Sequence, residues 1–131
     1  MNRAVALLLL LNCAVAAAAE PSGERLAYMV GCINCHHQTP KEMINAPPLA
    51  IVTAYSLPEF RHLLKTGITR TGRDLLAQSS LMGIVAKEQF SYLTDDEVAS
   101  IYKFLHDDWT AERAAKEEAK IPVLYKAGAQ H

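Results

Sequence analysis

Residues 29–40 read MVGCINCHHQTP and place two cysteines and two histidines within six consecutive positions. Three kinds of site use two thiols in C-x-x-C spacing with an imidazole directly after the second. They are half of a zinc site, a dithiol redox pair and the attachment point of a covalent haem. The rest of the chain has to distinguish between these three.

The first nineteen residues have the form of a secretory signal peptide. Arg3 precedes an apolar run over residues 4–11, and small residues lead to a cleavage site after Ala19. The apolar stretch is shorter than the roughly 20 residues of a membrane-spanning helix. A lipoprotein site at Cys13 fits the short run before it poorly. We therefore expect cleavage after Ala19, export to the periplasm and no membrane span in the mature protein.

The mature chain, residues 20–131, is long enough for one small domain. We expect this domain over residues 20–108, followed by a charged tail, helical or frayed, over residues 109–131. After cleavage only Cys32 and Cys35 remain, and a disulfide between them would close too small a loop to stabilise much. Twelve Lys and Arg against fourteen Asp and Glu give no basic excess for nucleic acid.

Apolar spacing and capping residues predict an all-α protein of three to four helices. Ser22 is a plausible N-cap for a helix over residues 22–35, whose apolar positions repeat with helical period. Helices starting after Ser56 and Thr94 are each preceded by a capping box, Ser-x-x-Glu or Thr-x-x-Glu. No segment alternates polar and apolar residues for long enough to predict a strand.

Two long segments, residues 37–55 and 67–90, have no clear period and are predicted to be loops. Loops of this length are unusual in so small a domain. They would be explained if they wrapped around a large apolar cofactor.

Covalent haem fits the motif best among the three kinds of site. A structural zinc ion needs four ligands, and the chain contains no second paired motif to complete the set. A thioredoxin-like dithiol follows a strand, whereas this motif follows a predicted helix. In the haem interpretation, Cys32 and Cys35 form the two thioether bonds of one haem c, and His36 is the proximal iron ligand.

The chain resembles a class I c-type cytochrome over about residues 22 to 107, and especially those that serve periplasmic dehydrogenases. Three stretches carry the resemblance: GERLAYMVGCINCH, FRHLLKTGITRTGRDLLAQSSLMG and FSYLTDDEVASIYKFL. The resemblance implies the small cytochrome c fold, in which a terminal helix packs across the first. It also implies a distal methionine in the loop before that helix. Met82 occupies this place, although Gly83 follows it where many relatives have proline.

We therefore expect Met82 to be the sixth ligand of the iron. The other candidates are expected in structural or surface roles: Met29, His37, Met43, His62 and His106. Met29 is expected to pack in the core, and Met43 to fill space in the proline-containing loop. The ring of His37, next in the chain to His36, cannot easily reach the same iron.

Histidine and methionine together fill the iron's coordination sphere and suit both oxidation states. This predicts a periplasmic one-electron carrier, not itself an enzyme, either soluble or as the cytochrome subunit of a dehydrogenase or oxidase. Its expected partners are a periplasmic dehydrogenase as donor and an oxidase or another cytochrome as acceptor. The alternative is a haem-based ligand-binding or sensor protein, because Gly83 could loosen the loop that carries Met82. A small peroxidase is a third, less favoured reading.

Four basic residues fall within thirteen positions: Arg61, Lys65, Arg70 and Arg73. Residues 95–118 instead hold eight acidic residues and three basic ones. Two solvated faces are the commoner explanation of such charge runs. The sharper hypothesis is that the basic residues hold the haem propionates or face an acidic partner.

Overall fold

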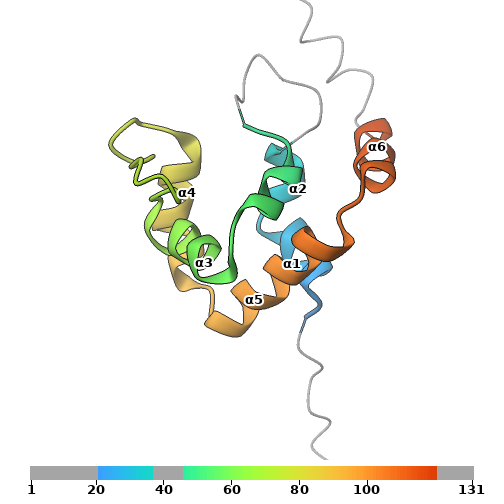
Figure 1. Ribbon diagram of the computed structural model, residues 1–131, viewed down its shortest axis with the longest axis horizontal. Helices are drawn as coiled ribbons and strands as arrows, with labels where there is room; N and C mark the ends of the chain where they lie inside the picture. Colours follow the sequence, from blue (N-terminus) through green and yellow to red (C-terminus); the bar gives the residue numbers. More distant parts are fainter. Residues whose placement is uncertain (1–20, 37–45, 121–131) are drawn as a thin grey trace, which may run out of the picture.

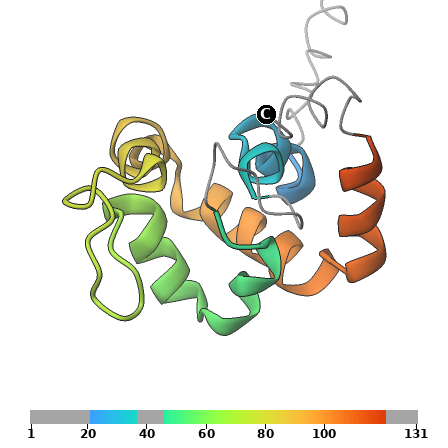
Figure 2. The same cartoon turned by 90° about the horizontal axis from the view of Figure 1, so that it is seen from above.

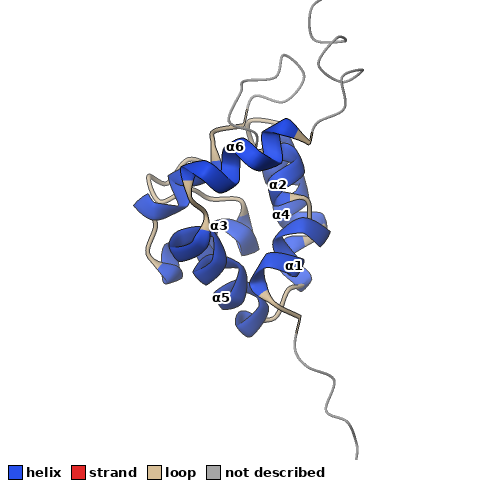
Figure 3. Cartoon of the chain, turned by 90° about the vertical axis from the view of Figure 1, so that its right-hand side faces the viewer, coloured by secondary structure: helices blue, strands red, loops and turns tan. Residues whose placement is uncertain are grey.

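The computed structural model describes residues 21–36 and 46–120. This part of the chain is all-α, as predicted, and contains no strand (Figure 3). The elements, in chain order, are α1 (Gly23–Met29), α2 (Cys32–Cys35), the 3₁₀ helix η1 (Leu49–Ala54), α3 (Leu57–Thr66), α4 (Leu81–Glu88), the 3₁₀ turn η2 (Phe90–Tyr92), α5 (Asp95–Lys103), the π-helical segment η3 (Phe104–Asp108) and α6 (Ala111–Ala119). None of these helices is long and apolar enough to cross a membrane.

The helices form two groups that α5 joins. Figure 1 shows α1 and α2 on one side and α3 and α4 on the other, with α5 running beneath both. Helix η1 lies between the two groups and contacts η3. This arrangement places the C-x-x-C-H motif and the segment around Met82 on opposite sides of the molecule's centre.

Helices α3 and α5 begin as the sequence predicts. Both N-termini have complete capping boxes, in which the backbone N–H of Ser56 donates to Glu59 Oε2 at 2.8 Å and that of Thr94 donates to Glu97 Oε2 at 2.7 Å. Helix α3 ends at Gly67, whose φ of +74° closes the last turn in a left-handed conformation. These ends are therefore fixed by local side-chain chemistry.

The first predicted helix is wrong in one respect, because it breaks at Gly31. This residue has φ +86° and separates α1 from α2. The buried face of α1 is centred on Leu26 and Ala27, and Met29 lies about 200° around the helix from Ala27. Met29 is consequently 68% exposed, so the prediction that it packs in the core is also wrong.

Helix α5 packs across α1 where Gly23 faces Ser100. A Cβ atom on Gly23 would lie 1.8 Å from the carbonyl oxygen of Ser100, so only glycine permits this approach. Val98 and Ile101, on the buried face of α5, are fully inaccessible to solvent. This pairing agrees with the expected packing of the helix from Asp95 across the first helix.

Helix α4 corrects the prediction that residues 67–90 form a loop. Met82 is its second residue, so it lies on a helix and not in a loop. The helix starts after Ser80 and includes Gly83. Gly83 is buried, and a Cβ there would lie 2.3 Å from the backbone nitrogen of Leu76. The glycine therefore allows the chain before α4 to pack directly against it.

The charged segment after Trp109 forms helix α6, which packs on the body of the domain beside α1 (Figure 2). Ala114 is buried at its centre, with 2% of its surface exposed. The guanidinium of Arg113 donates to Glu24 Oε1 at 2.7 Å and lies over the ring of Phe104. Residues 111–119 are thus part of the folded unit, and residues 121–131 lie outside the described part.

Candidate functional site: a cavity between the C-x-x-C-H motif and α4

All four predicted site residues line one cavity. Cys32, Cys35, His36 and Met82 all contribute to its wall, although forty-six residues separate the histidine from the methionine. The cavity has a volume of about 390 Å³, within the range of small-molecule and cofactor sites. The fold therefore brings together four side chains that were chosen from the sequence.

The remaining wall of this cavity is mainly apolar. Helix η1, α3, α4 and the start of η2 supply most of it, with Val52, Phe60, Leu64, Val85 and Phe90 among the lining side chains. Ile51 and Leu81 also line the cavity and are 42% and 50% exposed, so part of its edge reaches the surface. Such walls suit a large, flat, apolar group with one exposed edge.

His36 is held by a backbone carbonyl. Its Nδ1 lies 2.6 Å from the carbonyl oxygen of Pro47, and since a carbonyl only accepts, Nδ1 carries the proton and donates. Nε2 is then the nitrogen whose lone pair can bind a metal. Metal-binding histidines are commonly oriented in this way by a hydrogen bond from the other ring nitrogen.

The two cysteines are free thiols at the start and end of α2. Cys32 is buried, and burial raises the pKa of its thiol to about 12. The reactive cysteine of dithiol oxidoreductases has a lowered pKa. Both this environment and the helix that precedes the motif disfavour the dithiol redox alternative.

Met82 is partly buried and packs against the core of the domain from α4. None of the other described candidate ligands lines the cavity. His62 and His106 are exposed, and the His106 ring lies beside Tyr102 with its Nδ1 2.8 Å from Asp107 Oδ1. His37 and Met43 lie outside the described residues.

Zinc finds no support in the described ranges. Within residues 21–36 and 46–120, no three His, Cys, Asp or Glu side chains gather into a group that could hold a metal ion. A second hollow, of about 500 Å³, lies over α1, η3 and the start of α6. Most of its lining residues are polar or charged, and the ion pair between Arg113 and Glu24 belongs to it.

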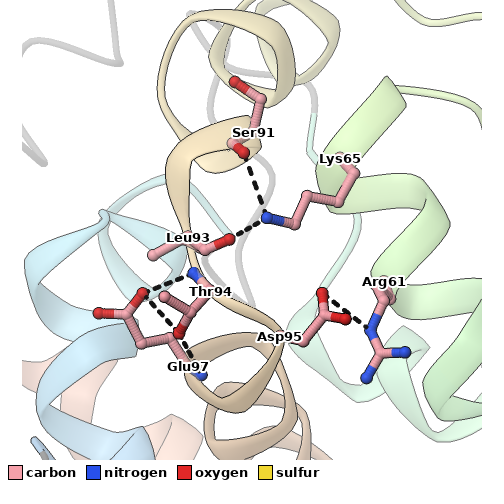
Figure 4. A network of polar contacts seen from close by, with 7 residues as sticks. All are labelled: Arg61, Lys65, Ser91, Leu93, Thr94, Asp95 and Glu97. Carbon is pink, nitrogen blue, oxygen red and sulfur yellow. Dashed lines mark hydrogen bonds and ion pairs between the residues drawn. The ribbon is translucent and has the colours of Figure 1, made fainter.

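The basic residues predicted for docking or propionate binding separate into two groups. Three of them make contacts within the protein: Lys65 Nζ donates to the carbonyl oxygens of Ser91 and Leu93, Arg61 Nε lies 3.5 Å from Asp95 Oδ1, and the Arg70 guanidinium donates to the Ala54 carbonyl. Figure 4 shows Lys65 and Arg61 directed toward the link between η2 and α5. Only Arg73 of the four lines the cavity.

The sequence did not reveal the Pro47 carbonyl as the partner of His36. A backbone acceptor carries no side-chain signal, and its position depends on how the chain returns after the motif. The sequence likewise did not indicate which of the four basic residues lines the cavity. Arg73 does so because of the hairpin on which it lies.

Comparisons of the chain with protein-family models, with curated proteins and with solved structures find no match.

Proposed function

We propose that this protein binds one covalent haem c in the cavity and works as a one-electron carrier. One observation carries the proposal: two thiols, an imidazole and a thioether line one mainly apolar cavity. The donor set suits haem c, because thioether attachment needs two thiols and a low-spin iron takes one ligand from each face.

Each residue has a role that follows from its surroundings. Cys32 and Cys35 would hold the haem by thioether bonds, and His36, oriented by Pro47, would bind the iron through Nε2. Met82, on α4, would supply its sulfur as the second protein ligand of the iron. The bound haem would supply an iron that alternates between Fe(II) and Fe(III). The apolar walls would exclude water and, with the methionine, favour a raised potential.

The sensor alternative loses the argument that supported it. That argument was that Gly83 could loosen the segment carrying Met82, but Gly83 is buried within α4 against the backbone of Leu75 and Leu76. Electron transfer in the periplasm remains the proposal, with the small cytochrome c fold around the haem. The proposed partners are a dehydrogenase as donor and an oxidase or another cytochrome as acceptor.

The test is expression in a bacterium that carries out periplasmic haem c maturation. Acid–acetone extraction of the purified protein should leave the haem on the polypeptide, in a ratio of one haem per chain. A variant in which Cys32 and Cys35 are both alanine should release any haem into the solvent. Free haem from the unaltered protein, or a protein without colour, would refute the proposal.

A further inference from the structure

Arg73 brings a positive charge to one side of the mainly apolar cavity. Among the described residues that line the cavity, Arg73 is the one with a permanent charge. Within residues 21–36 and 46–120, its guanidinium forms no ion pair or hydrogen bond. An apolar cavity with a single unpaired guanidinium at its wall fits a ligand that is apolar over most of its area and anionic at one edge.

A small hairpin fixes the backbone of Arg73. Its N–H donates to Thr69 Oγ1 at 3.1 Å, and its carbonyl accepts from the N–H of Thr69 at 3.0 Å. Gly72, with φ +81°, makes the turn between them. Leu75, two residues further on, is buried and lines the same cavity. The side chain of Arg73 is exposed, but the point from which it extends is held in place.

Arg70 occupies the same hairpin and serves as the natural comparison. Its guanidinium is also exposed, yet it donates to the Ala54 carbonyl and does not line the cavity. Two arginines three residues apart therefore have different surroundings. One ties the hairpin to the end of η1, and the other is directed to the cavity.

We propose that Arg73 binds the propionate carboxylates of the haem and so fixes the propionate edge at the hairpin between α3 and α4. The proposal rests on the proposed function and adds the orientation of the cofactor to it. Placing carboxylates beside apolar walls is costly unless they are paired. A guanidinium pairs with a carboxylate through two parallel hydrogen bonds, which also fixes geometry.

The test compares Arg73→Gln, Arg73→Lys and Arg70→Gln, each first shown by circular dichroism and haem content to be folded and loaded. The readouts are the propionate bending band in the resonance Raman spectrum and the midpoint potential. Arg73→Gln should shift the band and lower the potential, because a nearby cation disfavours the oxidised iron. Arg73→Lys should restore part of both changes. Arg70→Gln removes the same charge and should leave the band unchanged.

An unchanged band in Arg73→Gln would overturn the proposal, and slower electron transfer in that variant would then assign Arg73 to partner docking. If Arg73→Gln does not fold, Arg73→Lys decides, because an ammonium cannot reproduce the two parallel hydrogen bonds. An unshifted band in Arg73→Lys would then overturn the proposal. Failure of haem attachment in the unaltered protein would refute the proposed function instead, so the two failures are distinguishable.

Discussion

The Nδ1 atom of His36 lies 2.6 Å from the carbonyl oxygen of Pro47, eleven residues further along the chain. This contact joins the end of the C-x-x-C-H motif to the entry of η1, on the other side of residues 37–45. It also fixes the tautomer of the imidazole, because a carbonyl can only accept. The motif is thus more than a local arrangement of cysteines and histidine, since its imidazole is already oriented by the fold.

Met82 is expected to be the sixth ligand, and Met82→Ala tests this directly. The oxidised protein should show the weak long-wavelength absorption that marks iron–methionine coordination, and the variant should lose it. The midpoint potential should also fall, because methionine ligation raises it. Met29→Ala is the matched control, because this methionine is 68% exposed and should leave both properties unchanged. Retention of the absorption in Met82→Ala would move the ligand elsewhere, with Met43 the next residue to test.

Gly83→Ala should displace Met82, the residue before it on α4. Its Cβ would lie 2.3 to 2.6 Å from backbone atoms of Leu75 and Leu76, so α4 and this segment must separate. Overpacking of this kind costs typically about 1–3 kcal/mol. Urea denaturation should show the loss, and the iron–methionine absorption should weaken.

Gly72→Ala provides the control for this prediction. Nothing lies within 4 Å of the Cβ position at Gly72, but its φ of +81° makes the variant strained by roughly 1–2 kcal/mol. This variant should lose stability while keeping the methionine absorption. Equal spectra in the two variants would show that Gly83 does not position Met82.

The parts of the fold that local chemistry determines could be predicted from the sequence. The capping boxes at Ser56 and Thr94 are both present where expected, and Gly67 ends α3 in a left-handed conformation. Each involves residues no more than four positions apart, so the sequence contains both partners. Cys32, Cys35 and His36 could likewise be selected from their spacing alone, and all three line the cavity. Their joint role in binding haem stays a prediction.

The errors arose where distant segments decide the structure. Residues 67–90 were predicted to be a loop, but α4 forms there, and the close approach of residues 75–76 makes Gly83 necessary within it. Met29 was predicted to be buried because it fits the apolar spacing of one helix over residues 22–35, but that helix is interrupted at Gly31. Lys65 reads as a solvated charge because its two carbonyl partners lie twenty-six and twenty-eight residues away. None of these contacts has a signal within its own stretch of sequence.

Lys65→Glu should destabilise the fold rather than report on docking alone. The Lys65 ammonium donates to the carbonyls of Ser91 and Leu93, which connect α3 to the entry of α5 (Figure 4). Hydrogen bonds to charged groups contribute about 1.5–3 kcal/mol, and a carboxylate would face the two carbonyls instead. The free energy of unfolding in urea should fall by at least this much.

Lys87→Glu is the matched control for this charge reversal, because Lys87 is exposed on α4. It should leave the free energy of unfolding within about 0.5 kcal/mol of the unaltered protein. If Lys65→Glu were equally stable, the carbonyl contacts would not hold α3 in place. A slower electron transfer in that variant could then be assigned to partner docking.

The contact between α1 and α6 should weaken at high pH. Burial, followed by a hydrogen bond to Glu117, raises the pKa of Tyr28 from the usual 10.0 to about 12. A raised pKa means that the folded protein holds this proton more tightly than the unfolded chain does. The stabilisation is thus fully present below about pH 10 and is lost as the pH rises through about 12. A deprotonated Tyr28 would also face the carboxylates of Glu117 and Glu24.

Trp109, the single tryptophan of the chain, lies two residues before the start of α6 and should report on this contact through its fluorescence. Between about pH 10 and 12, the unaltered protein should show a transition in tryptophan emission that Tyr28→Phe lacks. Tyr92→Phe is the control, because Tyr92 is 83% exposed and lies on η2. This substitution also removes one phenol but leaves α6 unaltered. Tyr28→Phe should also make the contact weaker but independent of pH over this range, because the phenol that bonds Glu117 is gone. An identical transition in Tyr28→Phe and the unaltered protein would place the titrating group elsewhere.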